Sequence, residues 1–172
     1  MARKPGRKNA IAGQFAARPI AMLEAPAYRV LSRAAHLVLS RLEIEHAHHG
    51  GKDNGKLPCT YQHFQEFGVH ERMIAPAVRE LVALGLVEIT RRGCGGNAEF
   101  RQPNLYRLTY RPAHDASGDG THEYQAIPTI DRADEIAKQA RLAADPGAVR
   151  RAKNKIPPTQ SEPFRLHKVG AK

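Results

Sequence analysis

The sequence has no tryptophan, only two cysteines and no long hydrophobic run, and each absence narrows what the chain can be. Cys59 and Cys94 form no Cys-x-x-Cys pair, which excludes a zinc ribbon and a disulfide framework and favours a reducing cytoplasm. The apolar start is interrupted by Gln14, Arg18 and Pro19, so it lacks the hydrophobic region of a secretory signal. No stretch approaches the length of a membrane span. An organelle transit peptide shares this Arg-rich, acid-free composition and remains an alternative.

Acidic residues are scarce at both ends of the chain. The 172 residues include 27 Lys and Arg against 17 Asp and Glu, a formal net charge of +10. Residues 1–18 hold five basic side chains and no acid, and residues 145–172 hold seven against two acids. The middle is neutral, with 15 of each sign. Such basic ends predict a phosphate-rich partner, with the tails supplying contacts that do not depend on base sequence.

Hydrophobic spacing predicts three helices in the first half of the chain. Apolar residues recur every three or four positions from Pro26 to about residue 48, and the Gly50-Gly51 pair ends that helix. After a brief strand at "KLPC", Thr60 is a suitable N-cap for a short helix, "YQHFQEF", which ends at Gly68. The next helix begins near Glu71. Its apolar stripe consists of Ile74, Val78, Leu81 and Leu84, and Gly85 closes it in the left-handed conformation.

The second half predicts a hairpin and one more helix. "LVEIT" and "NLYRLTY" alternate as half-buried strands around the Gly-rich basic loop "RRGCGGNAEFRQP". Residues 111–128 have the composition of a linker, and residues 129–144 form a helix with a stripe of small residues: Ala133, Ile136, Ala137 and Ala140. Its acids come early and its bases late, which complements the helix dipole. Residues 145–172 are basic, contain proline and are expected to be disordered.

The stretch "LPCTYQHFQEFGVHERMIAPAVRELVALGLVEI" resembles the bacterial winged helix-turn-helix family of DNA-binding proteins found in chromosomes, plasmids and phages. The resemblance covers roughly residues 26–110 and rests on the helix at Thr60, the Gly68-Val69 turn and "AVRELVALGLVEI". It implies an α+β, mostly α, fold: three helices plus a β-hairpin wing, extended by a C-terminal helix and disordered basic tails. The expected organisation is an arm (1–18), a winged domain (19–110), a linker (111–128), a helix (129–144) and a tail (145–172).

By this resemblance, a recognition helix at about residues 71–84 enters the major groove, and a wing at about 91–103 contacts backbone or minor groove. The base-reading candidates, on the face opposite the apolar stripe, are Arg72, Ala75, Pro76 and Arg79. Arginine can span guanine O6 and N7, and apolar groups can contact the thymine methyl. Glu71 and Glu80, on or near this face, depart from the pattern of a strong DNA binder. Candidate DNA-backbone contacts are Thr60, Tyr61 and Gln62; wing contacts are Arg91, Arg92, Asn97 and Arg101; arm contacts are Arg3, Lys4, Arg7 and Lys8.

Pro76 raises a separate question. A proline inside a helix loses a hydrogen bond and clashes with the carbonyl four residues earlier, here that of Arg72, at a cost of about 3 kcal/mol. The cost disappears if the regular helix starts after Arg72; otherwise the helix should kink. A smooth Ala75-Pro76 surface would let backbone approach base edges, and the alternative is that Pro76 only rigidifies the start of the helix.

Other candidate sites are weaker. Glu45, His46, His48 and His49 contain an i, i+4 pair with metal-binding chemistry, but histidines at a helix C-terminus also complement its dipole, so no metal or other cofactor is expected. Cys94 is either a redox-sensitive thiol or an incidental loop residue. The sequence contains no plausible catalytic trio and no phosphate-binding Gly-Lys-Ser/Thr motif, which predicts a protein that is not an enzyme.

The function expected from the sequence is binding of double-stranded DNA in the bacterial cytoplasm, as a transcriptional regulator or an accessory factor of a mobile element. The alternatives are a plasmid or phage replication initiator or partition protein, and a winged helix that binds other proteins. A homodimer, formed through the long first helix or through helix 129–144, is left open. Neither a membrane nor a small-molecule ligand is expected as a partner.

Overall fold

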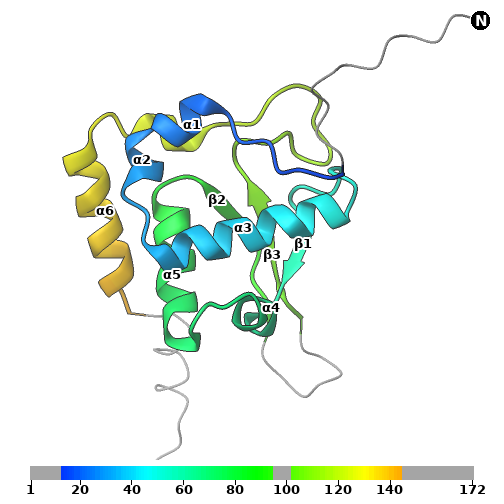
Figure 1. Cartoon of the computed structure of the whole chain (residues 1–172), viewed down its shortest axis with the longest axis horizontal. Coiled ribbons are helices and arrows are strands. Elements are labelled where there is room, and N and C mark those ends of the chain that lie inside the picture. The colour runs from blue at the N-terminus through cyan, green and yellow to red at the C-terminus, as the bar shows by residue number, and fades with distance from the viewer. Residues whose placement is uncertain (1–12, 95–101, 145–172) are drawn as a thin grey trace, which may run out of the picture.

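The computed structural model describes residues 13–94 and 102–144. This part of the chain is α+β, with helices around a three-stranded antiparallel sheet (Figure 1). The elements in chain order are α1 (Ile20–Glu24), α2 (Pro26–Arg29), α3 (Arg33–His48), β1 (Leu57–Cys59), α4 (Tyr61–Glu66), α5 (Glu71–Ala83), β2 (Val87–Arg91), β3 (Asn104–Leu108), the 3₁₀ helix η2 (Glu123–Ala126) and α6 (Ile130–Leu142). None of these helices is long and apolar enough to cross a membrane.

The first long helix is broken where the sequence predicted continuity. Pro26 begins the short α2, and a new helix, α3, starts after Ser32, whose hydroxyl accepts a hydrogen bond from the Ala35 amide at 3.2 Å. Ser32 has an extended backbone, and its own N–H donates to the Glu80 carboxylate at 2.8 Å. The backbone amide of Ser32 is therefore paired with a residue of α5. Its side chain caps α3 by satisfying one of the N–H groups in the first turn of that helix. Gly50 and Gly51 follow α3 with positive φ, as expected for residues that end a helix.

The sheet has the strand order β1-β3-β2, so the last strand in sequence lies in the centre. Strand β1 pairs with β3 from Leu57 opposite Tyr106 to Cys59 opposite Asn104. Strand β1 ends at Cys59 and α4 follows it, so this pairing places the start of α4 near Asn104, the first residue of β3. The predicted brief strand and the two strands of the predicted hairpin are therefore confirmed.

The core lies where α3, α5 and the sheet meet. Leu39 and Leu42 from α3, Ile74 and Leu81 from α5, and Tyr106 from β3 are fully buried in one hydrophobic cluster. Phe64 from α4 joins them and meets the Tyr106 ring edge-on, with 6.2 Å between the centroids. The predicted apolar stripe of α5 is confirmed, and it fixes which face of this helix points away from the core.

Within residues 111–128, whose composition predicted a linker, the helix η2 packs on the body, whereas residues 114–119 are exposed. The side chain of Tyr124, in η2, is only 1% exposed. The η2 backbone lies against Gly85, where a Cβ would come within 2.8 Å of the Tyr124 nitrogen. Gly85 has the expected positive φ, +70°, after α5. This glycine therefore allows both the helix end and the close approach of η2.

Helix α6 packs along α5 and α2 (Figure 1). Thr129 caps it by accepting a hydrogen bond from the Arg132 amide, and Ala133 and Ala137 are fully buried. The predicted helix is confirmed. Two of its small residues, Ala133 and Ala137, allow close packing within this chain.

Candidate nucleic-acid interface

The turn between α4 and α5 has local causes in the sequence. Thr60 caps α4 by accepting a hydrogen bond from the His63 amide at 3.3 Å. Gly68 ends that helix with φ of +92°, and Val69 is buried beneath the turn. His70 then caps α5, because its Nδ1 accepts from the Arg72 amide at 3.3 Å. The turn joins the C-terminal end of α4 to the N-terminal end of α5, and the N-terminal end of α5 lies on the surface of the molecule.

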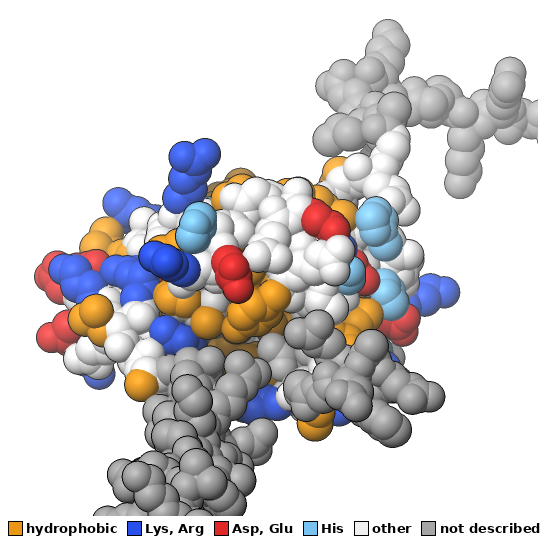
Figure 2. Space-filling model, turned by 90° about the horizontal axis from the view of Figure 1, so that it is seen from below, with side chains coloured by type: hydrophobic (Ala, Val, Ile, Leu, Met, Phe, Trp, Pro, Cys, Tyr) orange, Lys and Arg blue, Asp and Glu red, His pale blue; other side chains and the backbone are white. Residues whose placement is uncertain are grey.

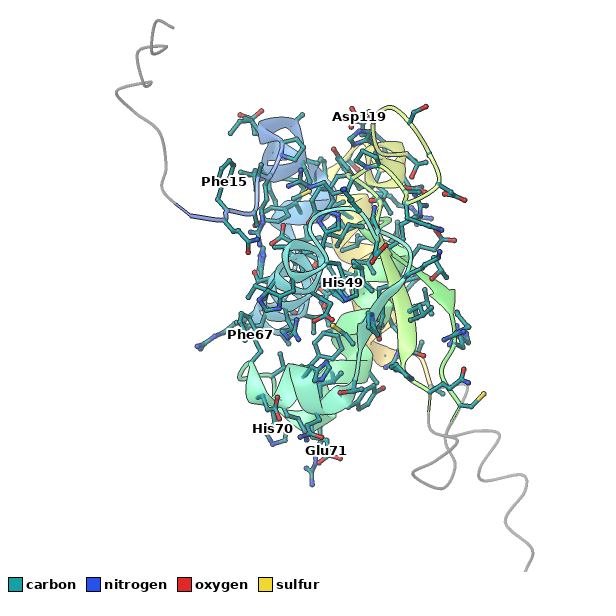
Figure 3. All side chains as sticks on the ribbon, turned by 90° about the vertical axis from the view of Figure 1, so that its right-hand side faces the viewer. Phe15, His49, Phe67, His70, Glu71 and Asp119 are labelled. Atoms are coloured by element: carbon teal, nitrogen blue, oxygen red, sulfur yellow. The ribbon has the colours of Figure 1, made fainter. Side chains whose placement is uncertain are left out.

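The first turn of α5 is the most prominent part of this surface. Figure 3 shows His70 and Glu71 at the tip of the molecule, with Phe67 just before them. Arg72 and Met73 are also exposed there. At the start of α4, Tyr61 and Gln62 are exposed and Thr60 is half-buried. Arg72 lies at the N-terminal end of α5, whereas the three proposed backbone-contacting residues lie at the N-terminal end of α4, the end away from the Gly68 turn. Free N–H groups and the positive end of the helix dipole favour anions at a helix N-terminus.

Ala75 and Pro76 are half-buried, so they are less accessible than Arg72. Helix α5 runs from Glu71 to Ala83 with Pro76 inside it, so the first of the two alternatives for Pro76, a regular helix that starts only after Arg72, is not observed. Pro76 provides no N–H for the Arg72 carbonyl in the second turn.

Arg79 corrects the predicted set of base-reading residues. Its Nε donates to the Ala140 carbonyl at 3.0 Å, and one terminal nitrogen donates to the Arg141 carbonyl at 3.1 Å. These carbonyls belong to the last turn of α6, where the helix dipole is negative and favours a cation. The guanidinium therefore holds α6 against α5 instead of pointing freely to solvent.

Glu80 also lies elsewhere than expected, because its side chain is fully buried and not near the recognition face. Its carboxylate accepts from the Ser32 amide and, at 2.7 Å, from the Ser32 hydroxyl. Arg141 of α6 donates to the same carboxylate at 2.7 Å. Glu80 thus joins three helices. On the helical wheel Glu80 lies at the edge of the apolar stripe, beside Leu84 and Ala77, and this position was the signal for burial.

The hairpin contributes two exposed basic side chains, Arg91 and Arg92, at the end of β2. Gly93 follows, and its amide donates to the Asn104 side chain at 2.7 Å, which ties the end of β2 to the start of β3. Cys94 is exposed. Asn97 and Arg101, the other predicted wing contacts, lie outside the described residues.

The predicted N-terminal arm is described only from residue 13. Arg3, Lys4, Arg7 and Lys8 lie outside the described residues, whereas Arg18 is bound to the body. Its Nε donates to the buried Glu43 at 2.8 Å and a terminal nitrogen donates to the Tyr28 hydroxyl at 2.7 Å. The hydrogen bond to Glu43 raises the pKa of Arg18. The body therefore begins before residue 19.

The histidine-rich end of α3 does not form a joint site from the four residues singled out in the sequence. His48 is exposed, and burial lowers the pKa of His46. His49 lies 3.4 Å from the Glu45 carboxylate, and its hydrogen bond to Asp53 raises its pKa. Only Glu45 and His49 of this group are brought together.

Charge on the exposed end is mixed. Figure 2, which views the molecule from below Figure 1, shows basic side chains interspersed with acidic and hydrophobic ones. Glu66 and Glu71 are exposed near Arg72. This face (Figure 2) is therefore not a continuous basic patch, and the excess charge belongs to the two ends of the sequence.

Comparisons of the chain with protein-family models, with curated proteins and with solved structures found no match. The case for a function therefore depends on the geometry of these residues.

Proposed function

We propose that this protein is a winged helix-turn-helix protein that binds double-stranded DNA, with the first turn of α5 in the major groove. The observation that carries the proposal is the exposed N-terminal end of α5 at a tight turn after α4, with Arg72 on it. The order α3, β1, α4, α5, β2, β3 and the hairpin beside α4 support the winged arrangement.

Each part of this surface has a distinct role in the proposal. Arg72 reads a base edge, since its planar guanidinium matches the two acceptors of guanine. Thr60, Tyr61 and Gln62 hold phosphate at the start of α4. Arg91 and Arg92 contact the backbone or the minor groove from the hairpin. Because the described body is nearly neutral, the basic ends of the chain supply a large part of the affinity.

The cellular role consistent with this chemistry is that of a bacterial transcriptional regulator or a mobile-element accessory factor in the cytoplasm. A replication or partition role would use the same surface on repeated sites. The exposed Glu71 beside Arg72 favours a second candidate, a winged helix that binds other proteins. These candidates differ in whether a duplex is bound at all.

The test measures binding of the full chain to labelled duplexes by fluorescence anisotropy across a range of salt concentrations. R72A should weaken binding by about 1–3 kcal/mol on a selected site and reduce discrimination among bases. The matched control is R132A, which removes another exposed arginine from the N-terminal end of α6. Arg132 lies eight residues before Ala140, a rise of about 12 Å along α6, so the R132A change is made away from the last turn of α6 that Arg79 contacts.

An equal loss of duplex affinity in R72A and R132A would mean that Arg72 contributes only non-specific charge. Absence of duplex binding by the unaltered protein at moderate salt would overturn the proposal and favour the protein-binding candidate.

A further inference from the structure

We propose that Glu45, Cys59 and His63 bind a divalent transition-metal ion of the zinc class. Ligand atoms of these three side chains, one from each, lie within 4.8 Å of one another. Glu45 and Cys59 are buried and His63 is half-buried. The histidine-rich motif in the sequence pointed to Glu45, but neither Cys59 nor His63 was recognised, because the fold alone brings them to α3.

The donor set suits this class of metal. Zinc is bound by thiolate sulfur, imidazole nitrogen and carboxylate oxygen with bonds of about 2.0–2.3 Å, which places tetrahedral ligand atoms about 3.5 Å apart. The three groups therefore need to approach by little more than about 1 Å to surround an ion. Three residues separate Cys59 from His63, a short spacing that lets one turn of chain present both.

The surrounding contacts are those of an incompletely satisfied polar cluster. Nδ1 of His63 is buried and has no hydrogen-bond partner among the described residues. Arg41 contacts the Glu45 carboxylate at 2.8 Å and is the cation that an incoming metal must displace or accommodate. On the other carboxylate oxygen of Glu45 lies His49 Nε2, at 3.4 Å.

Water is the candidate for a fourth ligand. His49 lies against the Glu45 carboxylate but is not one of the three residues whose ligand atoms lie within 4.8 Å of one another, and its Nδ1 lies 2.9 Å from the Asp53 carboxylate.

An ion here would join the end of α3, the end of β1 and the first turn of α4. Thr60, Tyr61 and Gln62 lie between Cys59 and His63 in the sequence, so the ion would also order the segment proposed to hold phosphate. That consequence rests on the proposed function, whereas the metal site itself does not.

The experiment titrates the untagged full chain with Co²⁺ alone and records absorption. Thiolate ligation gives a sulfur-to-cobalt charge-transfer band in the near ultraviolet, and tetrahedral cobalt gives visible bands. The unaltered protein should show both at one ion per chain, and Zn²⁺ should abolish them by competition. C59S should remove the charge-transfer band, while C94S, which changes the other cysteine, should retain it.

Two histidine variants provide a second matched pair. H63N should weaken cobalt binding by about tenfold or more, whereas H48N, at an exposed histidine of the same region, should leave it unchanged. R41Q should tighten binding, because it removes the competing cation. DNA binding is measured separately, so failure of either proposal is recognisable on its own.

Absence of a thiolate band in both the unaltered protein and R41Q would overturn the proposal. So would a band that survives C59S or disappears in C94S. If C59S does not fold, as judged by circular dichroism, H63N against H48N decides the question.

Discussion

The two ends of α5 lie in opposite surroundings, although one continuous helix carries both. At the N-terminal end, Glu71, Arg72 and Met73 are exposed to solvent. Towards the C-terminal end, Arg79 and Glu80 are held by α6 and by Ser32. Residues of the same chemical type thus have different roles: Glu71 and Arg72 are available to a partner, whereas Glu80 and Arg79 hold the fold together.

The pair of glutamates gives the largest expected difference. E80Q should lower the free energy of unfolding by about 3 kcal/mol, because it leaves Arg141 without a carboxylate and weakens the hydrogen bonds from Ser32. E71Q, on the exposed end, should change it by no more than about 0.5 kcal/mol. Urea denaturation of both variants measures this contrast. Equal losses would mean that the two ends of α5 are not distinct.

The glycines that precede and follow α5 also differ in their surroundings. G85A should destabilise by about 2–3 kcal/mol, since it combines a left-handed backbone with a clash against η2. G68A, also at positive φ but with open space around the added methyl group, should cost about 1 kcal/mol. Thermal unfolding of the two variants separates backbone strain from packing. A G85A variant no less stable than G68A would show that η2 does not press on the end of α5.

The arginines give the smallest expected effect on stability. R79A should cost about 1 kcal/mol of unfolding free energy, because hydrogen bonds to the last turn of α6 are lost. Its duplex affinity should stay within about 0.5 kcal/mol of the unaltered protein, in contrast to R72A. Anisotropy and denaturation on the same sample test both statements. A loss of duplex affinity in R79A as large as that in R72A would mean that Arg79 contacts DNA after all.

The parts of the fold that the sequence predicted are those with local causes. Thr60, Gly68 and Gly85 mark helix ends through their own backbone and side-chain chemistry, and the alternation in "LVEIT" marks a strand. The same holds for the exposed position of Arg72, which follows from the apolar stripe of α5.

The parts that the sequence did not predict depend on partners far along the chain. The helix break at Ser32 involves Glu80, 48 residues later, and Arg79 is bound by carbonyls 61 and 62 residues later. Nothing in the local composition of residues 111–128 indicates that Tyr124 fills a place beside Gly85. Cys59 and His63 likewise meet Glu45 only through the tertiary fold.

Hydrogen exchange of the full chain with and without duplex DNA shows which backbone amides the duplex protects, and therefore whether the first turn of α5 lies against it. We expect protection at residues 60–62 and 70–73, together with Arg91 and Arg92, and no change along α6. Protection on α6 with residues 60–73 unaffected would contradict this expectation.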